Sequence, residues 1–565
     1  MNPFLIVFSD TGGFCTIGQR AESRYHGLFL PAGNSFFRIL EDICPEGHSG
    51  KPVLTVESEY SAFRRFPNGV RESFVLQGET LLYERDTQGN TDLFLDFREA
   101  YNANGLHRDY DFQEEEDGVR IRFQNLQFLP DSSLFIKTDQ KQRLWSLEWV
   151  RREYSFDAER EGGEGEFYVL RCRLGPVRRI SLSLEGRKKW GEENIESENI
   201  WEVSNDSSNL QKATHSSAIA LRGLLSERDG RKGLFAGHPW FFQFWTRDEA
   251  ISAKGLCLAG KRETAKRILL GALSRMDSTG RIPNRYPASD LSSADGVGWI
   301  FFRLRELFRE GFLLSSEQEM VKNALQTSLQ RLEKKLLHDG LFYNGPLETW
   351  MDTGFQSDTR EGYCIEIQAL MLSMYAFLHE LAPNSPLTTG AKGFLKQTSF
   401  RERIRQAFWN GQFLRDEASG NLLRPNLFLA AYIAPEILSK SEWKSCFDAA
   451  LEKLWLSWGG LSTIEKNHPL FHAHYTGENN RSYHRGDSWF FVNHLVAIAL
   501  YRTDKKQYAE YIQKIQEAST AEILHSGAIG CCAEVSSAQE RRSEGCFNQA
   551  WSNATFLEMA REIGK

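Results

Sequence analysis

The sequence predicts an α+β fold in two parts, an N-terminal antiparallel β-sandwich followed by an (α/α)6 barrel, which is a toroid of six helical hairpins. Short stretches with two-residue alternation run to about Gly191, and from about Thr214 the apolar residues repeat with a helical period. Long and short connections then alternate between the helical stretches. We assign residues 1–190 to the sandwich, 191–213 to a linker and 214–565 to the barrel.

The predicted strands of the N-terminal part are short and are bounded by Gly, Asp and Asn. The first is the apolar run within residues 1–8. Further strands are expected at residues 71–76, 80–83, 91–96, 119–123, 146–150 and 178–184. Many short strands separated by turn residues are typical of an antiparallel sandwich. The segment 187–209 is charged and poor in apolar residues, and we interpret it as a linker with room for one helix.

The C-terminal part is expected to contain twelve helices, at residues 214–228, 247–260, 261–277, 293–311, 315–337, 361–382, 391–410, 425–437, 440–456, 487–502, 505–525 and 547–562. Connections after even-numbered helices are brief. Those after odd-numbered helices are mostly longer and hold much of the Trp, Tyr, His and carboxylate content. Six hairpins in a ring put all the odd connections at one end. We expect the functional site on that rim, because loops on a rigid scaffold carry sites.

The composition argues against several classes of protein. Lys plus Arg number 68 against 75 Asp plus Glu, so the net charge is −7, and nothing attracts nucleic acid. The apolar run at the start has no basic flank and is shorter than a signal peptide core or a membrane span, so we expect no membrane association. Nine cysteines without metal-finger spacing predict reduced thiols in a cytoplasmic protein. The aromatic residues, 12% of the chain, fill a large core or line a cleft for sugar faces.

The first two rich loops carry candidates for sugar binding. Trp240, Trp245, Arg247 and Asp248 combine stacking surfaces with groups that form bidentate hydrogen bonds. The alternative is that Asp248 caps a helix while the aromatic residues pack in the core. The second rich loop leads to Asp295, and on its own this residue is weak evidence for sugar binding.

The third rich loop offers a general acid. A carboxyl group near an aromatic residue can have a raised pKa and stay protonated near neutral pH. Asp352, beside Trp350, is preferred over Glu348, Asp358 and Glu361. For any one of these acids, a solvated or helix-capping role is about as common. The fourth loop, around Arg424-Pro-Asn426, fits a structural role at least as well as ligand contact.

The fifth loop is rich in histidine. His472, His474 and His484 could in principle bind zinc, but recognition of hydroxyl groups by His484, Arg485 and Trp489 is better supported. We therefore predict no metal and no cofactor. The predicted substrate-binding residues are Trp240, Trp245, Arg247, Asp248, Asp295, Trp350, Glu361, His484, Arg485 and Trp489.

The sixth loop holds Glu534 among small apolar residues, which leave room for a water molecule held by its carboxylate. A lone Glu in a loop usually faces solvent, but this one lies on the same predicted rim as Asp352. Two carboxylates across a ring suit hydrolysis of a glycosidic bond, in which one protonates the leaving oxygen and the other activates water. A separation of roughly 6.5–9.5 Å gives inversion of the anomeric carbon.

The order of several motifs resembles the amylo-α-1,6-glucosidase part of glycogen debranching enzymes, from about Gly237 to Glu558. The matching motifs are Trp245-Thr-Arg-Asp248, Ile282-Pro-Asn284 with Ser293-Ala-Asp295, Thr349-Trp-Met-Asp352, Arg360-Glu-Gly with Glu366, Arg424-Pro-Asn426, Tyr483-His-Arg-Gly486 with Trp489, and Gln549-Ala-Trp-Ser552. Near the start, Ser23-Arg-Tyr-His-Gly-Leu28 looks like a signature of bacterial and archaeal members. The resemblance covers more than half of the chain.

The resemblance implies an inverting, exo-acting glucosidase that removes α-1,6-linked glucose from branch points of glycogen-like glucans or oligosaccharides. It maps the general acid to Asp352 and the general base to Glu534. Around the base, the chain reads Cys531-Cys-Ala-Glu-Val535, where family members usually show a Gly-rich Pro-Glu segment. A glucanotransferase domain has no room in this chain. The alternatives are an α-glucosidase of other linkage specificity, a noncatalytic glucan-binding protein or, with less support, a phosphorylase. The oligomeric state stays open.

Overall fold

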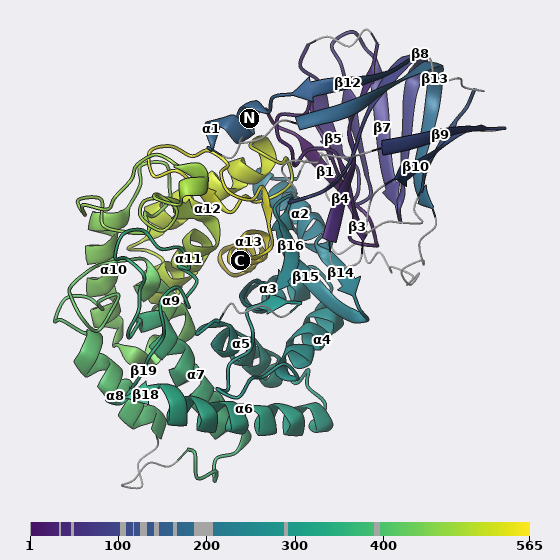
Figure 1. The fold of residues 1–565 in the computed structure, drawn as a ribbon. Coiled ribbons are helices and arrows are strands. Elements are labelled where there is room, and N and C mark those ends of the chain that lie inside the picture. Colours follow the sequence, from purple (N-terminus) through teal and green to yellow (C-terminus); the bar gives the residue numbers. More distant parts are fainter. Residues whose placement is uncertain are drawn as a thin grey trace.

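The computed structural model describes residues 2–32, 35–46, 50–101, 109–116, 118–124, 133–140, 146–161, 167–185, 207–287, 292–388 and 396–564. Its N-terminal part is an antiparallel β-sheet and its C-terminal part is mostly helical (Figure 1). The predicted linker falls largely outside the described residues. No described helix is both long enough and apolar enough to cross a membrane.

The N-terminal sheet contains thirteen strands among the described residues, and every pairing within it is antiparallel. They are β1 (Leu5–Phe8), β2 (Phe14–Ile17), β3 (Leu28–Ala32), β4 (Ser35–Pro45), β5 (Val53–Val56), β6 (Ser61–Arg65), β7 (Arg71–Gln77), β8 (Thr80–Glu99), β9 (Asp109–Glu115), β10 (Gly118–Gln124), β11 (Ser133–Thr138), β12 (Ser146–Arg152) and β13 (Phe167–Glu185). The main path runs β1-β2-β3-β4-β8-β13-β11-β10-β9, with β5–β7 branching from β8 and β12 from β13.

Two long strands join the halves of this sheet. β8 pairs with β7 at residues 80–85 and with β4 at residues 91–99, while register shifts in β13 lie between Leu174 and Arg179. The strands expected at 80–83 and 91–96 are therefore one strand. The polar residues between them, which are expected to separate two strands, stay within β8. Apolar side chains from both halves, including Leu76 of β7 and Leu95 of β8, form one buried cluster.

The helical part contains a counterpart of each of the twelve expected helices, with ends that differ by a few residues. They are α2 (Asn209–Arg222), α3 (Thr246–Leu258), α4 (Arg262–Leu273), α5 (Gly296–Arg309), α6 (Ser315–Leu336), α7 (Ile365–Leu381), α8 (Lys396–Phe408), α9 (Asn426–Ile433), α10 (Lys440–Leu454), α11 (Phe490–Asp504), α12 (Ala509–His525) and α13 (Ala550–Ile563). A short helix, α1 (Ser155–Glu159), belongs to the N-terminal part.

The odd-numbered helices from α3 to α13 contact one another in order, and α13 contacts α3, so their contacts close into a ring. The even-numbered helices lie outside them (Figure 1). The sequence explains the two layers. α9 is buried along its whole length and α11 is buried from Phe490 to Leu500, whereas α8 buries only three residues. A helix that is apolar on all sides is stable only when surrounded, and an amphipathic helix covers it from outside.

The expected helix at 214–228 is wrong at its end, because α2 stops at Arg222. Residues beyond it form the hairpins of β14 (Leu225–Arg228), β15 (Arg231–His238) and β16 (Phe241–Trp245). Asp229 and Gly230 both have positive φ angles, of 52° and 75°, as a tight two-residue hairpin turn requires. This small sheet also includes β17 (Arg285–Tyr286) and β22 (Asn548–Gln549).

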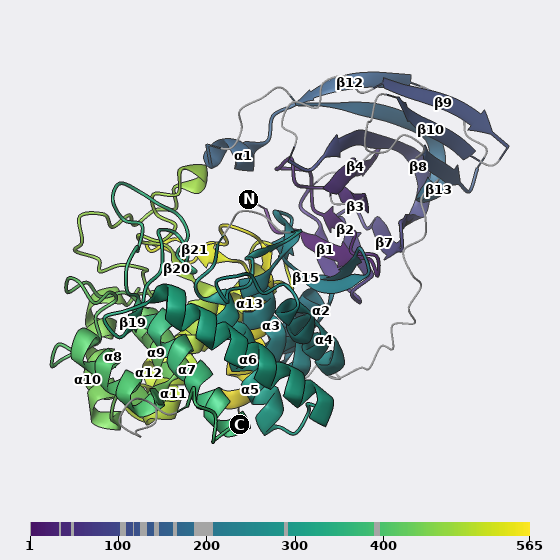
Figure 2. The ribbon, with the colours of Figure 1, turned by 60° about the horizontal axis from the view of Figure 1, so that its bottom comes forward.

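The two parts of the molecule are joined at several places. Phe4, just before β1, forms a parallel bridge with Ala528, in the loop between α12 and α13. α1 extends from the sheet toward the loops of the helical part (Figure 2). Arg160, directly after α1, forms an ion pair with Glu478 at 2.9 Å. The loops that enter the inner helices are therefore in contact with the N-terminal part.

Candidate active site

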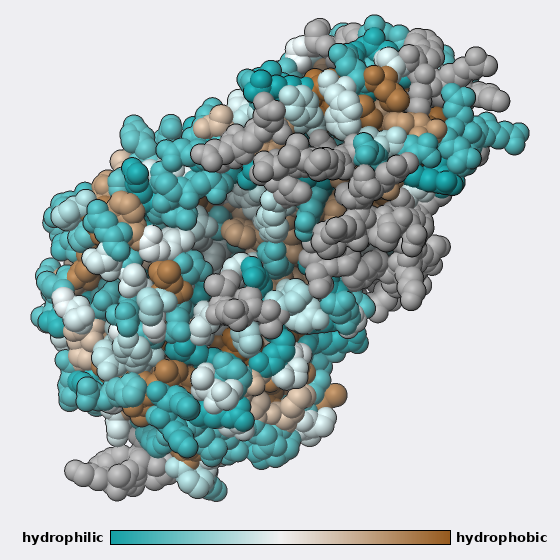
Figure 3. All heavy atoms as spheres, viewed as in Figure 1, coloured by the Kyte–Doolittle hydropathy of each residue, from teal (hydrophilic) through white to brown (hydrophobic). Residues whose placement is uncertain are grey.

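A cavity of about 440 Å³ lies where the N-terminal sheet meets the helical ring. The surface is hollowed between the two parts on the face shown in Figure 3. The ring contributes most of the lining, through loops that precede α3, α7, α11 and α13. From these loops and the first turns of the helices that follow them, the cavity is lined by Trp240, Trp245, Arg247, Asp248, Trp350, Asp352, Tyr483, Trp489, Glu534, Gln549 and Trp551. These are the loops after odd-numbered predicted helices, so the rim predicted from connection lengths carries the cavity.

Asp352 is held on the cavity wall by Arg247, in the first turn of α3. The Arg247 guanidinium donates to Asp352 Oδ2 at 3.0 Å and to the carbonyl of Thr349 at 2.8 Å. Its Nε donates to Asp295, at the start of α5, at 2.7 Å. Arg247 and Asp295 are almost completely buried. The arginine therefore fixes both the backbone and the side chain of the segment that carries Asp352.

The charge environment of Asp352 favours its ionised form. Burial raises the pKa of this carboxyl, but His484 and Arg247 outweigh burial and hold the pKa below its usual range. The Nε2 atom of His484 lies 3.6 Å from Asp352 Oδ1. Burial lowers the pKa of His484 to about 4, so this ring is neutral at pH 7. In the free protein, Asp352 is thus a carboxylate with a permanent positive charge beside it.

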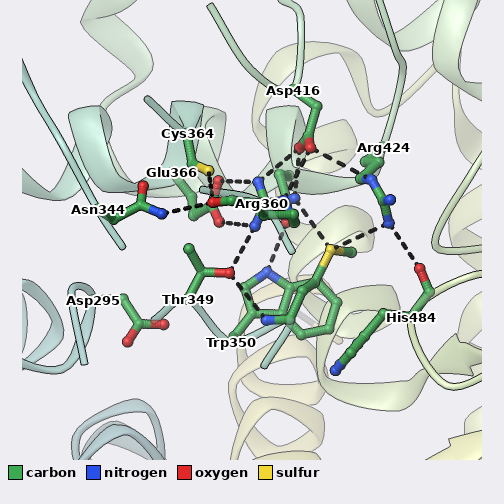
Figure 4. A network of polar contacts seen from close by, with 12 residues as sticks. Asp295, Asn344, Thr349, Trp350, Arg360, Cys364, Glu366, Asp416, Arg424 and His484 are labelled. Carbon is green, nitrogen blue, oxygen red and sulfur yellow. Dashed lines mark hydrogen bonds and ion pairs between the residues drawn. The ribbon is translucent and has the colours of Figure 1, made fainter. Parts of the chain in front are cut away.

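A second arginine also stabilises this segment, and Figure 4 shows it between Glu366 and Asp416. Arg360 is 4% exposed and donates to Glu366, to Asp416 and to the hydroxyl of Thr349. The indole of Trp350 donates to Asn426 at 2.7 Å. One cation shared by two buried carboxylates satisfies groups that would be costly to bury alone. The buried motif residues in this region build a platform that supports the segment, and one of them, Trp350, also lines the cavity.

Glu534 has a different environment on the opposite rim loop. Its Oε1 accepts a hydrogen bond from the Tyr483 hydroxyl at 2.6 Å, and its Oε2 accepts one from the backbone N–H of Cys546 at 3.0 Å. The pairing of β20 (Ser488–Trp489) with β21 (Val535–Ser536) places the loop beside α11. Gly545 has a positive φ of 64°, and a Cβ there would lie 2.4 Å from Glu534 Oε2. Glycine leaves the space that the carboxylate occupies.

The pKa of Glu534 is raised to about 7. Burial is the main cause, the charge of Asp352 adds to it, and the hydrogen bonds from Tyr483 and Cys546 oppose it. The pKa of neighbouring Asp248 is also raised, first by burial and then by the charges of Glu534 and Asp352. In the simplest assignment of catalytic roles, only the general acid has a raised pKa. Here the pKa of Asp352, the predicted acid, is lowered, and the pKa of Glu534, the predicted base, is raised.

Several buried polar atoms of lining residues lack a hydrogen-bond partner in the structure. They are the indole nitrogens of Trp245 and Trp551, the hydroxyl of Thr353 and the carbonyl oxygen of Gln549. Gln549 uses its amide nitrogen to donate to Asp248 at 3.0 Å. Unpaired donors and acceptors beside aromatic surfaces match a ligand with many hydroxyl groups and apolar faces, because buried polar groups are normally satisfied.

Four of the predicted substrate-binding residues do not line the cavity. Asp295 lies behind Arg247. His484 is 1% exposed and stacks on Trp489, with ring centroids 5.0 Å apart. Arg485 donates to Asp358 at 2.7 Å, and Glu361 accepts from the hydroxyl of Tyr343 in a neighbouring loop. The motifs in the sequence contain both residues that line the cavity and residues that hold the lining residues in place. The sequence alone does not distinguish the two kinds.

The structure also adds lining residues that the sequence did not single out. Tyr483, Gln549 and Trp551 lie within the motifs of the resemblance, which was the available signal for them. The N-terminal part contributes Arg24, Tyr25, Tyr101 and Arg160. Of these, Arg24 and Tyr25 lie in the Ser23–Leu28 motif, while nothing in the sequence connected Tyr101 or Arg160 with the rim.

No group of three or more His, Cys, Asp or Glu side chains with the geometry of a metal site is found within the described ranges. The histidines considered for zinc are therefore not gathered into such a group. His472 instead has its backbone N–H bonded to the carbonyl of Arg485 at 2.7 Å.

Comparisons with known proteins agree with these observations. The chain is similar to a crystal structure of bacterial glucoamylase complexed with acarbose, with a TM-score of 0.65 and 12% identity over 99% of this chain and 94% of the glucoamylase. It is also similar, with a TM-score of 0.47 and 14% identity, to a GH63 mannosylglycerate hydrolase from Thermus thermophilus, over 61% of this chain and 99% of that one. A search of curated proteins finds no match.

The glucoamylase likeness shows that the chain shares the overall fold of that protein along almost its whole length. A family model described as amylo-alpha-1,6-glucosidase matches residues 215–558, which is more than half of the sequence. The match covers the inner helices from α3 to α11, more than half of α13 and both rim carboxylates, and it confirms the resemblance found in the motifs. This protein belongs to the amylo-alpha-1,6-glucosidase family of glycoside hydrolases.

Proposed function

We propose that the protein is an inverting, exo-acting α-1,6-glucosidase that removes glucose from branch points of glycogen-like glucans or oligosaccharides. One observation carries this proposal. Asp352 and Glu534 lie on the walls of a single cavity that is also lined by five tryptophans and contains several unpaired polar atoms. Two carboxylates beside a surface for sugar faces are what glycosidic hydrolysis needs. The preference for α-1,6 bonds rests on the family.

In this proposal Asp352 is the general acid and Glu534 is the general base. A base works best when its pKa is near the working pH, and the pKa of about 7 at Glu534 meets this condition. Both of its oxygens already accept hydrogen bonds, which fix the orientation of the carboxylate. Asp352 must carry the proton for the leaving oxygen. Since its pKa is low in the free protein, the reactive form is the minor one in which the pair's single proton lies on Asp352.

We further propose that the closed ring of helices is an (α/α)6 barrel and that the sheet forms a β-sandwich. The division into residues 1–190, 191–213 and 214–565 stays part of this proposal. The proposal also includes a cytoplasmic location and a neutral α-glucan as the binding partner. No nucleic acid, membrane or cofactor takes part in the reaction as proposed.

Glucose release from panose and from a branched limit dextrin tests the activity, and the anomer formed tests the stereochemistry. We expect β-glucose as the first product, because inversion of an α-linkage gives the β anomer. A panel of α-1,4-, α-1,3- and α-1,2-linked disaccharides separates this proposal from another linkage specificity. Binding of these sugars without hydrolysis would instead identify a glucan-binding protein, and activity that required phosphate would identify a phosphorylase.

A further inference from the structure

The cavity has one wall that the helical ring does not supply. Arg24, Tyr25, Tyr101 and Arg160, all from the N-terminal part, line it together with ring residues. The proposed hydrolysis uses none of them. Tyr101 donates its hydroxyl to the carbonyl of Trp240 at 2.7 Å, so this wall is continuous with the first rim loop.

The Ser23–Leu28 motif is folded to present two of these side chains. The hydroxyl of Ser23 and the backbone N–H of Arg24 both donate to the buried carboxylate of Asp157, at 2.7 Å and 2.8 Å. Gly27 has a φ of 116°, and a Cβ there would lie 2.0 Å from the carbonyl oxygen of Leu40. The tight turn that only glycine permits and the anchor on Asp157 fix the backbone from which Arg24 and Tyr25 extend.

Arg160 links this wall to the ring. Its guanidinium lies 3.7 Å from the ring centroid of Trp240 and donates to Glu478 at 2.9 Å. The backbone N–H of Glu478 donates to the Arg160 carbonyl at 3.1 Å. A Cβ on Gly477 would lie 2.3 Å from that carbonyl oxygen, so glycine permits the close approach. Tyr25 meets Trp240 edge to face, with centroids 6.0 Å apart.

Unused donors remain on this wall. The Nε atoms of Arg24 and Arg160 are buried and have no hydrogen-bond partner in the structure, and Arg160 is 4% exposed. Arg24 has no carboxylate partner among the described residues. Guanidinium groups are donors only, so a ligand here must offer acceptor oxygens.

The opposite end of the cavity is closed by aromatic packing. Trp489 contacts Trp350 and Trp551, with centroids 5.3 Å and 5.6 Å apart, and Trp551 stacks on Phe491 at 4.4 Å. A sugar held between Asp352 and Glu534 therefore cannot extend inward through the ring. The rest of the substrate has to extend toward the N-terminal wall.

We propose that Arg24, Tyr25 and Arg160 with Trp240 form the binding site for the leaving group, and that this leaving group is a pyranose residue of an oligosaccharide. The proposal rests on the proposed glucosidase activity. Hydroxyl and ring oxygens accept from the two arginines, and the aromatic residues cover the apolar surface of the sugar. These side chains position the part of the substrate that departs, so they are positioning residues.

The test compares two substrates that share the glucosyl group and differ in what leaves. Panose has a sugar leaving group, whereas α-glucosyl fluoride loses a single atom that the wall cannot hold. In the full chain, we expect Arg24→Ala to lower kcat/KM for panose by roughly ten- to a hundredfold, mainly through KM, because a charge-assisted hydrogen bond is lost. The loss for the fluoride should be much smaller. Tyr25→Phe keeps the ring but removes the hydroxyl that accepts a hydrogen bond from Arg24 at 3.3 Å, so it should show the same selectivity to a lesser degree.

Arg151→Ala is the matched control, because Arg151 is an exposed arginine of the same sheet outside the cavity. It should not change the ratio of the two kcat/KM values. Equal losses on both substrates in Arg24→Ala and Tyr25→Phe, or unchanged panose hydrolysis in both, would overturn this inference while leaving the glucosidase proposal standing. A wild-type protein inactive on both substrates would overturn the glucosidase proposal and the inference with it.

Discussion

The two rim loops that carry Asp352 and Glu534 line the same cavity but are built on different chemistry. The Asp352 loop depends on charge, since buried arginines bind its backbone, its carboxylate and the platform that supports it. The Glu534 loop depends on neutral hydrogen bonds and on the space beside Gly545. The comparison teaches that two carboxylates on the walls of one cavity acquire opposite pKa shifts through their neighbours.

The largest expected effect comes from removing each carboxylate in turn. Asp352→Asn and Glu534→Gln should both lower kcat on panose by about a hundred- to ten-thousandfold, the usual contribution of general acid–base groups. On α-glucosyl fluoride, whose leaving group needs no proton, Asp352→Asn should keep most of its activity while Glu534→Gln should not. The opposite pattern would exchange the two roles.

The charged platform should dominate stability on the Asp352 side. Arg360→Met leaves Glu366 and Asp416 buried without their shared cation, so the free energy of unfolding should fall by about 3–5 kcal/mol in denaturant titrations. Arg401→Ala, which removes an exposed pair with Glu402, should cost less than about 1 kcal/mol. Similar losses in the two variants would show that the platform is not an essential support.

The space beside Glu534 can be tested with one methyl group. Gly545→Ala forces a Cβ against the carboxylate and should lower kcat on both substrates, in addition to about 1–2 kcal/mol of backbone strain. Gly420→Ala is the matched control. Its φ of 87° imposes similar strain, but nothing lies within 4 Å of the added Cβ. We expect the control to lose stability in thermal denaturation without the same loss of kcat, and equal kcat losses would argue against a steric effect on Glu534.

The smallest expected effect is a shift in pH dependence. In the free enzyme the reactive form carries one proton on the pair, so kcat/KM should fall as the pH rises through about 7, where that proton is lost. Tyr483→Phe removes a hydrogen bond that lowers the pKa of Glu534, and the alkaline limb should therefore move up by about one pH unit. Tyr475→Phe alters a lining tyrosine that donates no described hydrogen bond to Glu534, and it should not move this limb. If the alkaline limb does not move in Tyr483→Phe, the proton that controls this limb belongs to another group.

Periodicity in the sequence predicted the helices well, because the inner ones are apolar on every side and the outer ones carry a single apolar face. It failed at the end of the helix expected at 214–228, where Leu225–Arg228 form the first strand of a hairpin and the Asp-Gly turn follows directly. The rim was predictable from connection lengths alone. The orientation of its residues was not, since His484 and Arg485 belong to the same motif as the cavity residue Tyr483 and yet do not line the cavity.

Contacts between distant segments were beyond the reach of the sequence. Arg160 lies far along the chain from Trp240 and Glu478, and no pattern within either segment indicates that they meet. The Ser23–Leu28 motif could be recognised but not explained, because its anchor, Asp157, is more than a hundred residues away.

The bridge between Phe4 and Ala528 has a practical consequence. The backbone N–H of Phe4 donates to Gly527 and that of Ile529 donates to Phe4, within a few residues of Glu534. Trimming or tagging the chain at its first residues therefore alters the support of the loop that holds Glu534. Any recombinant form of this protein should leave residues 2–4 intact and carry its purification tag at the other end.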